Sequence, residues 1–179
     1  LTDCAGNLAR MLAKLAAAAA QGAALVVFPD CALPGYCFES LEEARPYAET
    51  IPGPATEAFT AACQKLNVHA VFGLLEADGE RMFNACVLVG PGGVVGVYRK
   101  VHLPFLGIDM FTTPGDRPFA VHEIQIGDQT LRVGMNICYD GSFPEAARVM
   151  TLQGADIILL PTNWPPGSEC MAGCVVNAR

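Results

Sequence analysis

Apolar segments of strand length alternate along the chain with longer segments whose apolar residues recur at helical spacing. We expect helices over residues 3–22, 41–48, 54–66, 142–154 and 168–179, and strands over residues 25–28, 68–75, 82–89, 94–98, 119–126, 131–137 and 156–160. Glycine-containing turns join the strands of 82–98 and of 119–137 into hairpins. This alternation is typical of mixed sheets covered by helices, so it predicts an α/β fold and argues against a bundle or an all-β sandwich.

Local signals mark several of these boundaries. Asp3 is a candidate N-cap of the first helix, and Gly22 closes that helix. Ser142 and Glu145 have the Ser-x-x-Glu spacing of a capping box, so we expect Glu145 to cap its helix rather than to act in catalysis. The strand at 25–28 is apolar at consecutive positions, which predicts burial on both faces.

The bulk composition is that of a globular domain. The chain has 179 residues, of which 52% are hydrophobic and 16% charged, so we expect one domain over residues 1–179. Its net charge is −7 and its basic residues form no run, which argues against nucleic acid or an anionic membrane surface as a partner. The apolar stretch before residue 28 is interrupted by Gln21 and Gly22, and the start has no signal-peptide pattern, so we expect no membrane span.

Cysteines are scattered, at positions 4, 31, 37, 63, 86, 138, 170 and 174. This spacing favours reduced thiols and a cytoplasmic chain over a disulfide framework. A zinc site needs close ligand pairs, and Cys170 with Cys174 is the single near match, without a second pair. The sequence therefore predicts no metal site.

Three reactive side chains each come just after an expected strand. Asp30 follows Leu-Val-Val-Phe-Pro, Lys100 follows Val-Val-Gly-Val-Tyr-Arg, and Cys138 follows Arg-Val-Gly-Met-Asn-Ile. Loops at strand ends are where active sites of such sheets form, so these groups can meet there. A helix beginning shortly after Cys138, with Lys100 nearby, would lower the thiol pKa and stabilise an oxyanion. The carboxylate would serve as base and acid.

Each of these residues also has an ordinary structural interpretation. An aspartate at a strand end is commonly a turn residue, a single lysine is commonly solvated, and a cysteine in an apolar segment is commonly core. The residue types alone leave both interpretations open.

The local sequences around them decide between the two. They are Phe-Pro-Asp-Cys-Ala-Leu-Pro-Gly-Tyr at 28–36, Tyr-Arg-Lys-Val-His-Leu-Pro at 98–104, Asn-Ile-Cys-Tyr-Asp-Gly-Ser-Phe-Pro-Glu at 136–145, and Gly-Ala-Asp-Ile-Ile-Leu-Leu-Pro-Thr-Asn-Trp at 154–164. In order and in spacing these segments resemble the nitrilase superfamily of carbon–nitrogen hydrolases. The resemblance covers essentially the whole chain. It implies an α-β-β-α sandwich, no cofactor, and hydrolysis of a non-peptide C–N bond through a cysteine thioester.

By position, the resemblance implies that Cys138 is the nucleophile and that Lys100 stabilises the oxyanion. Asp30 stands where the family has its catalytic glutamate, and it is shorter by one methylene, about 1.5 Å. Misplacing a reacting group by about 1 Å can cost on the order of 100-fold in rate, so we expect weak or altered activity unless the backbone compensates. Asp109, in the loop 104–115, is a candidate for positioning the substrate, with an exposed loop carboxylate as the alternative.

The candidates for lining the pocket are Tyr36, Tyr139, Phe143, Asn163 and Trp164, although aromatic residues at such positions are nearly as often plain packing. His102 is expected to be structural. The family's first strand and its C-terminal part are missing from this sequence, so we expect a sandwich that is incomplete at both ends and exposes apolar edges. The resemblance also implies a homo-oligomer.

Three functions remain open at this point. The leading hypothesis is an amidase, an N-carbamoyl amidase or a nitrilase that acts on a small molecule and releases ammonia or an amine. The rival is an impaired or truncated family member that serves as a binding or assembly module, supported by Asp30 and by the missing ends. A thiol redox protein is disfavoured, because no Cys-x-x-Cys pair stands at a helix start.

Overall fold

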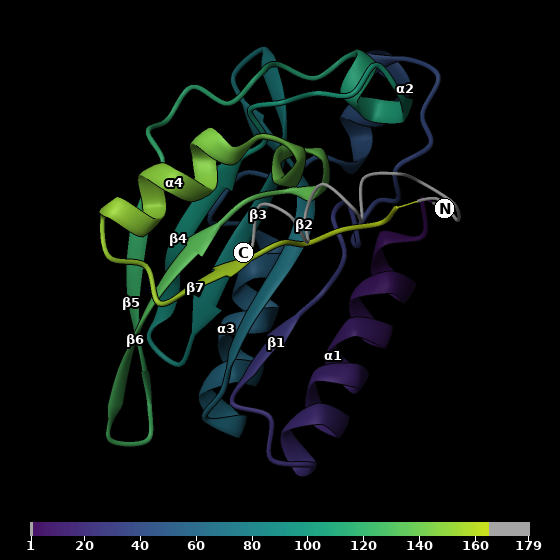
Figure 1. The fold of residues 1–179 in the computed structure, drawn as a ribbon. Helices are drawn as coiled ribbons and strands as arrows, with labels where there is room; N and C mark the ends of the chain where they lie inside the picture. Colours follow the sequence, from purple (N-terminus) through teal and green to yellow (C-terminus); the bar gives the residue numbers. More distant parts are fainter. Residues whose placement is uncertain (1, 165–179) are drawn as a thin grey trace.

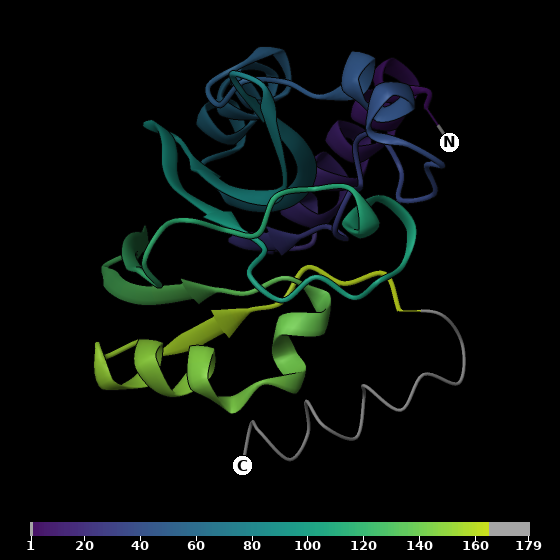
Figure 2. The same ribbon diagram turned by 90° about the horizontal axis from the view of Figure 1, so that it is seen from above.

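Two stacked β-sheets with helices on both outer sides form the fold of the computed structural model, which describes residues 2–164 (Figure 1). The first sheet has the order β1 (Leu25–Val27), β2 (His69–Asp78), β3 (Arg81–Gly90), β4 (Gly93–Arg99), and the second has the order β5 (Val121–Ile126), β6 (Gln129–Met135), β7 (Ile157–Leu159). Figure 2 shows the layers in sequence: α1 (Cys4–Ala20) and α3 (Pro54–Leu66), the first sheet, the second sheet, and α4 (Pro144–Leu152). The predicted α-β-β-α sandwich is confirmed.

Two apolar layers hold these elements together. The layer between the helices and the first sheet includes Met11, Leu15, Phe59, Phe72 and Val87. The layer between the two sheets includes Val71, Leu88, Ile124, Val133 and Met135. Each fully buried side chain of this size contributes about 1.5–3 kcal/mol relative to its exposed state, so the stacking follows from the apolar composition of the strands.

The helix and hairpin signals are largely confirmed. Asp3 is the N-cap of α1, and its side chain accepts a hydrogen bond from the Gly6 N–H. The turns of the β2–β3 and β5–β6 hairpins have Gly79 and Gly127 at φ +62° and +63°, a conformation that favours glycine. The expected helix at 41–48 is a short α2 (Leu41–Ala44) continued by a 3-10 turn, η1 (Arg45–Tyr47).

The predicted start of α4 is wrong. Phe143 is the N-cap residue and Pro144 the first helical residue, and no side chain caps this end. Ser142 instead ends a 3-10 helix, η3 (Cys138–Ser142). The reason is Pro144, because proline suits the first helical position and holds the residue before it in an extended conformation, here φ −111° and ψ 115°. The capping box and the capping role of Glu145 are therefore excluded.

Residues 25–28 were predicted to form a strand buried on both faces. The strand is confirmed, but the burial of both faces is wrong. β1 pairs in parallel with β2 at the edge of the first sheet, and Val27 is 42% exposed. Consecutive apolar residues indicate a strand, but local sequence does not show which strand is its neighbour.

The expected helix at 168–179 lies outside the described residues. Within residues 2–164 no helix is long and apolar enough to cross a membrane.

Candidate active site

The loops that follow β1, β4 and β6 bring Asp30, Lys100 and Cys138 together. All three are buried, with Lys100 fully so. The Lys100 Nζ lies 3.9 Å from Asp30 Oδ2. The pKa of Cys138 responds to both charges, because Asp30 raises it and Lys100 lowers it. The meeting of a carboxylate, an ammonium and a thiol that the sequence predicts is thus what the structure contains.

The position of Asp30 depends on a close backbone crossing. The loop after β1 passes over Gly73 of β2, where a Cβ atom would lie 2.5 Å from Asp30 Cα and 2.4 Å from Cys31 N. Cys31 has a φ of 47°, in the left-handed region. A larger residue at 73 would therefore push the Asp30 loop away from the sheet.

Lys100 is fixed by its main chain and by its neighbour Arg99. The Lys100 N–H donates to the Asn84 carbonyl, and the Lys100 carbonyl accepts from Gly115 N–H, both at 2.8 Å. Arg99 donates to both Glu76 carboxylate oxygens, at 2.7 and 2.6 Å, and its guanidinium lies 3.8 Å from the Phe83 ring centroid.

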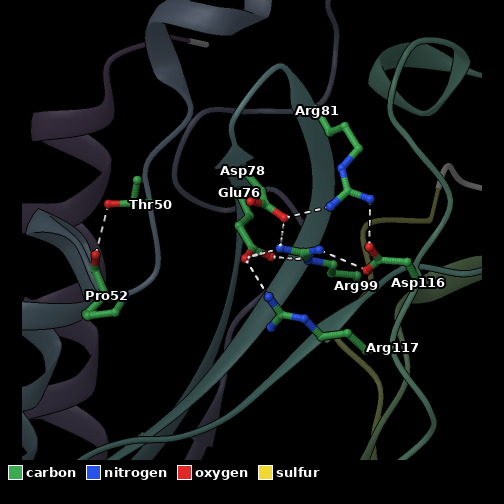
Figure 3. Close-up of polar contacts among 8 residues, drawn as sticks. All are labelled: Thr50, Pro52, Glu76, Asp78, Arg81, Arg99, Asp116 and Arg117. Carbon is green, nitrogen blue, oxygen red and sulfur yellow. Dashed lines mark hydrogen bonds and ion pairs between the residues drawn. The ribbon is translucent and has the colours of Figure 1, made fainter.

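Figure 3 shows the ion-pair network around Arg99, which continues to Asp78 at 3.0 Å and Asp116 at 2.8 Å. Arg81 bonds the same two carboxylates, and Arg117 joins at Glu76. A bidentate pair with a buried arginine is geometrically specific, so this network fixes the end of β4 from which Lys100 projects.

Asp109 is the closest partner of the lysine. It lies in a 3-10 helix, η2 (Gly107–Met110), and is 3% exposed. Its Oδ2 accepts from Lys100 Nζ at 2.5 Å and from the Tyr36 hydroxyl at 2.8 Å, and its Oδ1 accepts from Asn84 Nδ2 at 2.8 Å. The alternative of an exposed loop carboxylate is wrong for Asp109. Burial and the Asp109 charge raise the pKa of Tyr36, which stays a donor.

Asp140 links the Lys100 segment to the turn that contains Cys138. This buried carboxylate accepts from the Tyr98 hydroxyl at 2.9 Å, from both the backbone N–H and Nδ1 of His102 at 2.8 Å, and from the Ile137 N–H at 3.1 Å. The expectation that His102 is structural agrees with this contact.

The backbone of Cys138 is held separately. Cys138 begins η3 with a φ of 48°, and its N–H donates to the Pro161 carbonyl at 2.9 Å.

The environment of the thiol corrects one expectation. Burial, and then the negative Asp30, raise the pKa of Cys138 to about 11, although Lys100, the Asn163 backbone and the Trp164 indole act in the opposite direction. Lys100 lowers the pKa of the thiol, as predicted, but desolvation of the thiolate raises that pKa by more. A lowered thiol pKa is therefore not what the folded chain has.

The environment of Asp30 favours a base that works near neutral pH. Burial raises the Asp30 pKa to about 6, Lys100 lowers it and Asp109 raises it further. Among residues 2–164 neither carboxylate oxygen of Asp30 has a hydrogen-bond partner, although the backbones of Asp30 and Asn163 also lower its pKa. A carboxylate of this kind can take a proton from a neighbouring thiol that is itself not ionised.

A cavity of about 530 Å³ is lined by Tyr36, Cys37, Phe38, Glu39, Glu43, Leu106, Gly107, Asn163 and Trp164. The lining contains none of the three reactive residues, but it adjoins them, because Tyr36 bonds Asp109 and because Asn163 and Trp164 act on the Cys138 thiol. Asp30 lines a second cavity of about 330 Å³, together with Cys31 and Asn163. Three of the five residues expected to line the pocket, Tyr36, Asn163 and Trp164, are therefore at one cavity. The other two, Tyr139 and Phe143, pack edge to face at 5.2 Å, and Phe143 stacks on His102 at 3.8 Å. A role for these two in substrate binding stays a prediction.

Sequence reasoning missed Asn84 and Asp140. Asn84 is an amide inside the otherwise apolar segment 82–89, and Asp140 stands two positions after Cys138. A polar residue within an apolar strand is a signal for a specific buried contact, since an unpaired amide there is costly. Apart from Ile137, which is near Asp140, the partners of these two residues are distant in sequence, so their contacts were not visible.

Known families and solved structures match the chain in sequence and in fold. The family model described as carbon-nitrogen hydrolase matches residues 1–173. The chain belongs to the carbon-nitrogen hydrolase family. Among the relatives of this chain, the nitrilase of Pyrococcus abyssi is 42% identical over 147 residues, covering 82% of this chain and 54% of the relative. The citrullinase of Francisella tularensis is 35% identical, covering 88% of this chain and 56% of the relative.

Solved structures share the fold of this carbon-nitrogen hydrolase. A mutant of the amidase from Nesterenkonia sp. AN1, with acrylamide added at its active-site cysteine, matches with a TM-score of 0.78 and 24% identity over 98% of this chain and 67% of that one. An N-terminal amidase matches with a TM-score of 0.78 and 20% identity over 93% of this chain and 46% of that one. The chain spans about half the length of the curated relatives it matches. The incomplete ends, the homo-oligomer and the cytoplasmic location stay predictions.

Proposed function

We propose that this carbon-nitrogen hydrolase cleaves a small amide, N-carbamoyl amine or nitrile through a thioester on Cys138, and releases ammonia or an amine. The observation that supports this most directly is that Lys100, Asp30 and Cys138 lie together in the interior. The Lys100 Nζ is 3.9 Å from Asp30 Oδ2, and both charges affect the pKa of the Cys138 thiol. The cavity of about 530 Å³ beside them suits a small substrate.

The proposed reaction begins with proton transfer, because the Cys138 pKa of about 11 leaves the thiol protonated at neutral pH. As Cys138 Sγ attacks the carbonyl carbon of an amide, its proton passes to Asp30. The oxyanion that forms is stabilised by the Lys100 ammonium and by the backbone N–H of Tyr139, the residue after Cys138. Asp30 then gives the proton to the leaving nitrogen, the C–N bond breaks, and the thioester and ammonia remain.

The second half returns the enzyme to its starting state. Asp30, again a carboxylate, removes a proton from water as the water attacks the thioester. The C–S bond then breaks, and the proton on Asp30 returns to the thiolate of Cys138. The products are a carboxylic acid and the free thiol. Asp109 and Tyr36 take no proton in this scheme, and they hold the Lys100 ammonium in place.

Ammonia release tests this function. The intact protein is incubated with simple amides, carbamoyl amines and nitriles, beside Cys138→Ala and a control, Cys4→Ala, which removes a thiol in α1. The proposal expects release from at least one class, retained in Cys4→Ala and lost in Cys138→Ala. Release that survives in Cys138→Ala excludes the thioester route.

A specific observation supports a second candidate, an impaired member that acts as a binding or assembly module. Asp30 is an aspartate, and at 3.9 Å it is outside hydrogen-bond reach of Lys100. Binding of an amide to a folded wild-type protein without any ammonia release would favour this candidate over the hydrolase.

A further inference from the structure

Asn84 is a buried amide in the middle of an apolar strand. Its neighbours along β3 are Phe83 and Ala85, and its own exposure is 0%. Burying an amide costs free energy unless its donor and acceptor are both bonded. Here both are, because Nδ2 donates to Asp109 Oδ1 at 2.8 Å and Oδ1 accepts from the Cys31 thiol at 3.5 Å.

The contacts of Asn84 reach three segments around the lysine. Cys31 follows Asp30 directly, Asp109 is the ion-pair partner of Lys100, and the Asn84 carbonyl accepts the Lys100 N–H at 2.8 Å. A single residue of the rigid first sheet thus bonds the loop of the carboxylate, the main chain of the lysine and the carboxylate that holds the ammonium.

The geometry of Lys100 depends on how Asp109 is held. Asn84 bonds Oδ1 of Asp109, which leaves Oδ2 directed at Lys100 and Tyr36. The ammonium is consequently 2.5 Å from Asp109 and 3.9 Å from Asp30. The lysine pairs closely with one carboxylate, and neither oxygen of the other, Asp30, has a hydrogen-bond partner among residues 2–164.

We propose that Asn84 is a positioning residue: by orienting Asp109 it keeps the Lys100 ammonium from pairing directly with Asp30, which leaves Asp30 free to act as the base. This inference rests on the roles proposed above for Asp30 and Lys100. It assigns Asn84 no contact with the substrate.

Electrostatics explain why such positioning matters. Among the described residues, the charged and titratable groups around Asp30 come from several elements: Lys100 from the end of β4, Asp109 from η2, Cys138 from η3, Cys86 from β3, Tyr36, and the Cys31 thiol beside it. Their balance, with burial, places the Asp30 pKa at about 6. An opposite charge brought into direct contact lowers a carboxyl pKa by about 1–3 units, so a lysine that closed on Asp30 would make it a much weaker base near neutral pH.

The test removes the Asn84 donor and follows the titration of Asp30. Asn84→Leu keeps the shape of the side chain, and Asn84→Ser keeps a polar group that is too short to reach Asp109. Val87→Ala, which truncates a β3 residue on the α3 side, is the control for loss of strand packing. Circular dichroism and thermal unfolding identify which of the Asn84 variants fold.

Two readouts report the same group. One is the pH dependence of kcat for ammonia release. The other is the pH dependence of Cys138 alkylation by iodoacetamide, quantified on the Cys138 peptide because Cys37 is exposed and also reacts. The second readout needs no turnover. In the wild type and in Val87→Ala we expect both profiles to rise through an inflection near pH 6, where Asp30 ionises.

In each folded Asn84 variant we expect this inflection to move at least about one unit lower, with KM little changed. If half of the pKa change appears in the rate, kcat falls at least about threefold. An inflection that stays in place while kcat falls would show a purely structural role and overturn the inference. No inflection near pH 6 in the wild type would overturn it as well. If no compound releases ammonia but the alkylation inflection moves as expected, the Asn84 inference stands and the proposed function fails.

Discussion

Lengthening Asp30 by one methylene tests whether reach limits the proposed reaction. Proton transfer from the Cys138 thiol to the carboxylate needs the two heavy atoms to approach to about 2.6–3.2 Å. Asp30 raises the pKa of Cys138, so the two groups are neighbours, and neither Asp30 oxygen has a hydrogen-bond partner among residues 2–164. One additional C–C bond extends the reach of the carboxylate by about 1.5 Å.

The expected gain follows from two opposing effects of Asp30→Glu. Correcting a misplacement of about 1 Å is worth on the order of 100-fold in rate. The closer lysine lowers the carboxyl pKa by about one unit, which weakens the base by roughly threefold if half of that change appears in the rate. Reach therefore outweighs basicity, and kcat should rise at least about tenfold.

The assay compares kcat and KM of wild type, Asp30→Glu and the matched control Asp128→Glu, in an exposed hairpin turn, across pH 4–9. We expect higher kcat in Asp30→Glu alone, with its acidic inflection below the wild-type value of about 6. A folded Asp30→Glu variant whose kcat is unchanged or lower would refute the view that the short side chain is the deficit.

Three further predictions concern stability and substrate charge. The Asp30 pKa is raised from 3.8 to about 6, so ionised Asp30 destabilises the fold above pH 6. Replacing it in Asp30→Asn should therefore stabilise the fold at pH 8 by up to about 3 kcal/mol. This gain in unfolding free energy should disappear below pH 4. Glu76→Gln removes a carboxylate that bonds buried Arg99 twice and should cost about 3–5 kcal/mol of unfolding free energy. Because Glu39 and Glu43 line the cavity, an amide with a free carboxylate should have a higher KM than its neutral counterpart of equal length.

Each of these three predictions can be measured directly, and each has an outcome that would contradict it. Urea unfolding at pH 8 and below pH 4 tests Asp30→Asn, and an equal gain at both pH values would contradict the pKa argument. The same unfolding experiment tests Glu76→Gln against Asp78→Asn, an exposed partner of the same arginine. An equal effect of the two substitutions would contradict the importance of the buried pair. Butyramide against succinamate tests the charge preference, which equal KM values would contradict.

Most of the fold was predictable because its signals are local. The helical spacing of α1 and the glycine turns of the hairpins depend on residues close in sequence. Two predictions failed where the outcome depends on a neighbour in space or on a competing local rule. The exposure of Val27 follows from its edge position in the sheet, and Pro144 displaced the expected cap at Ser142.

The grouping of the three reactive residues was predictable from the sequence, whereas their pKa values were not. Asp30, Lys100 and Cys138 were found because each follows a strand and because their local sequences are specific. The burial of Asp109 and its bond to Asn84 depend on segments 25 residues apart, which no local pattern shows. The thiol pKa was predicted with the wrong sign because the sequence shows the neighbouring lysine but not how far burial desolvates the sulfur.

The central claim is that Cys138 forms a thioester with the substrate. Rapid acid quenching during turnover, followed by intact-protein mass spectrometry and peptide mapping, measures this directly. We expect a mass increase equal to the acyl group of the substrate, located on the peptide that contains Cys138 and absent from Cys138→Ala. Turnover without any acyl adduct on wild-type Cys138, or an adduct on another residue, would contradict the account.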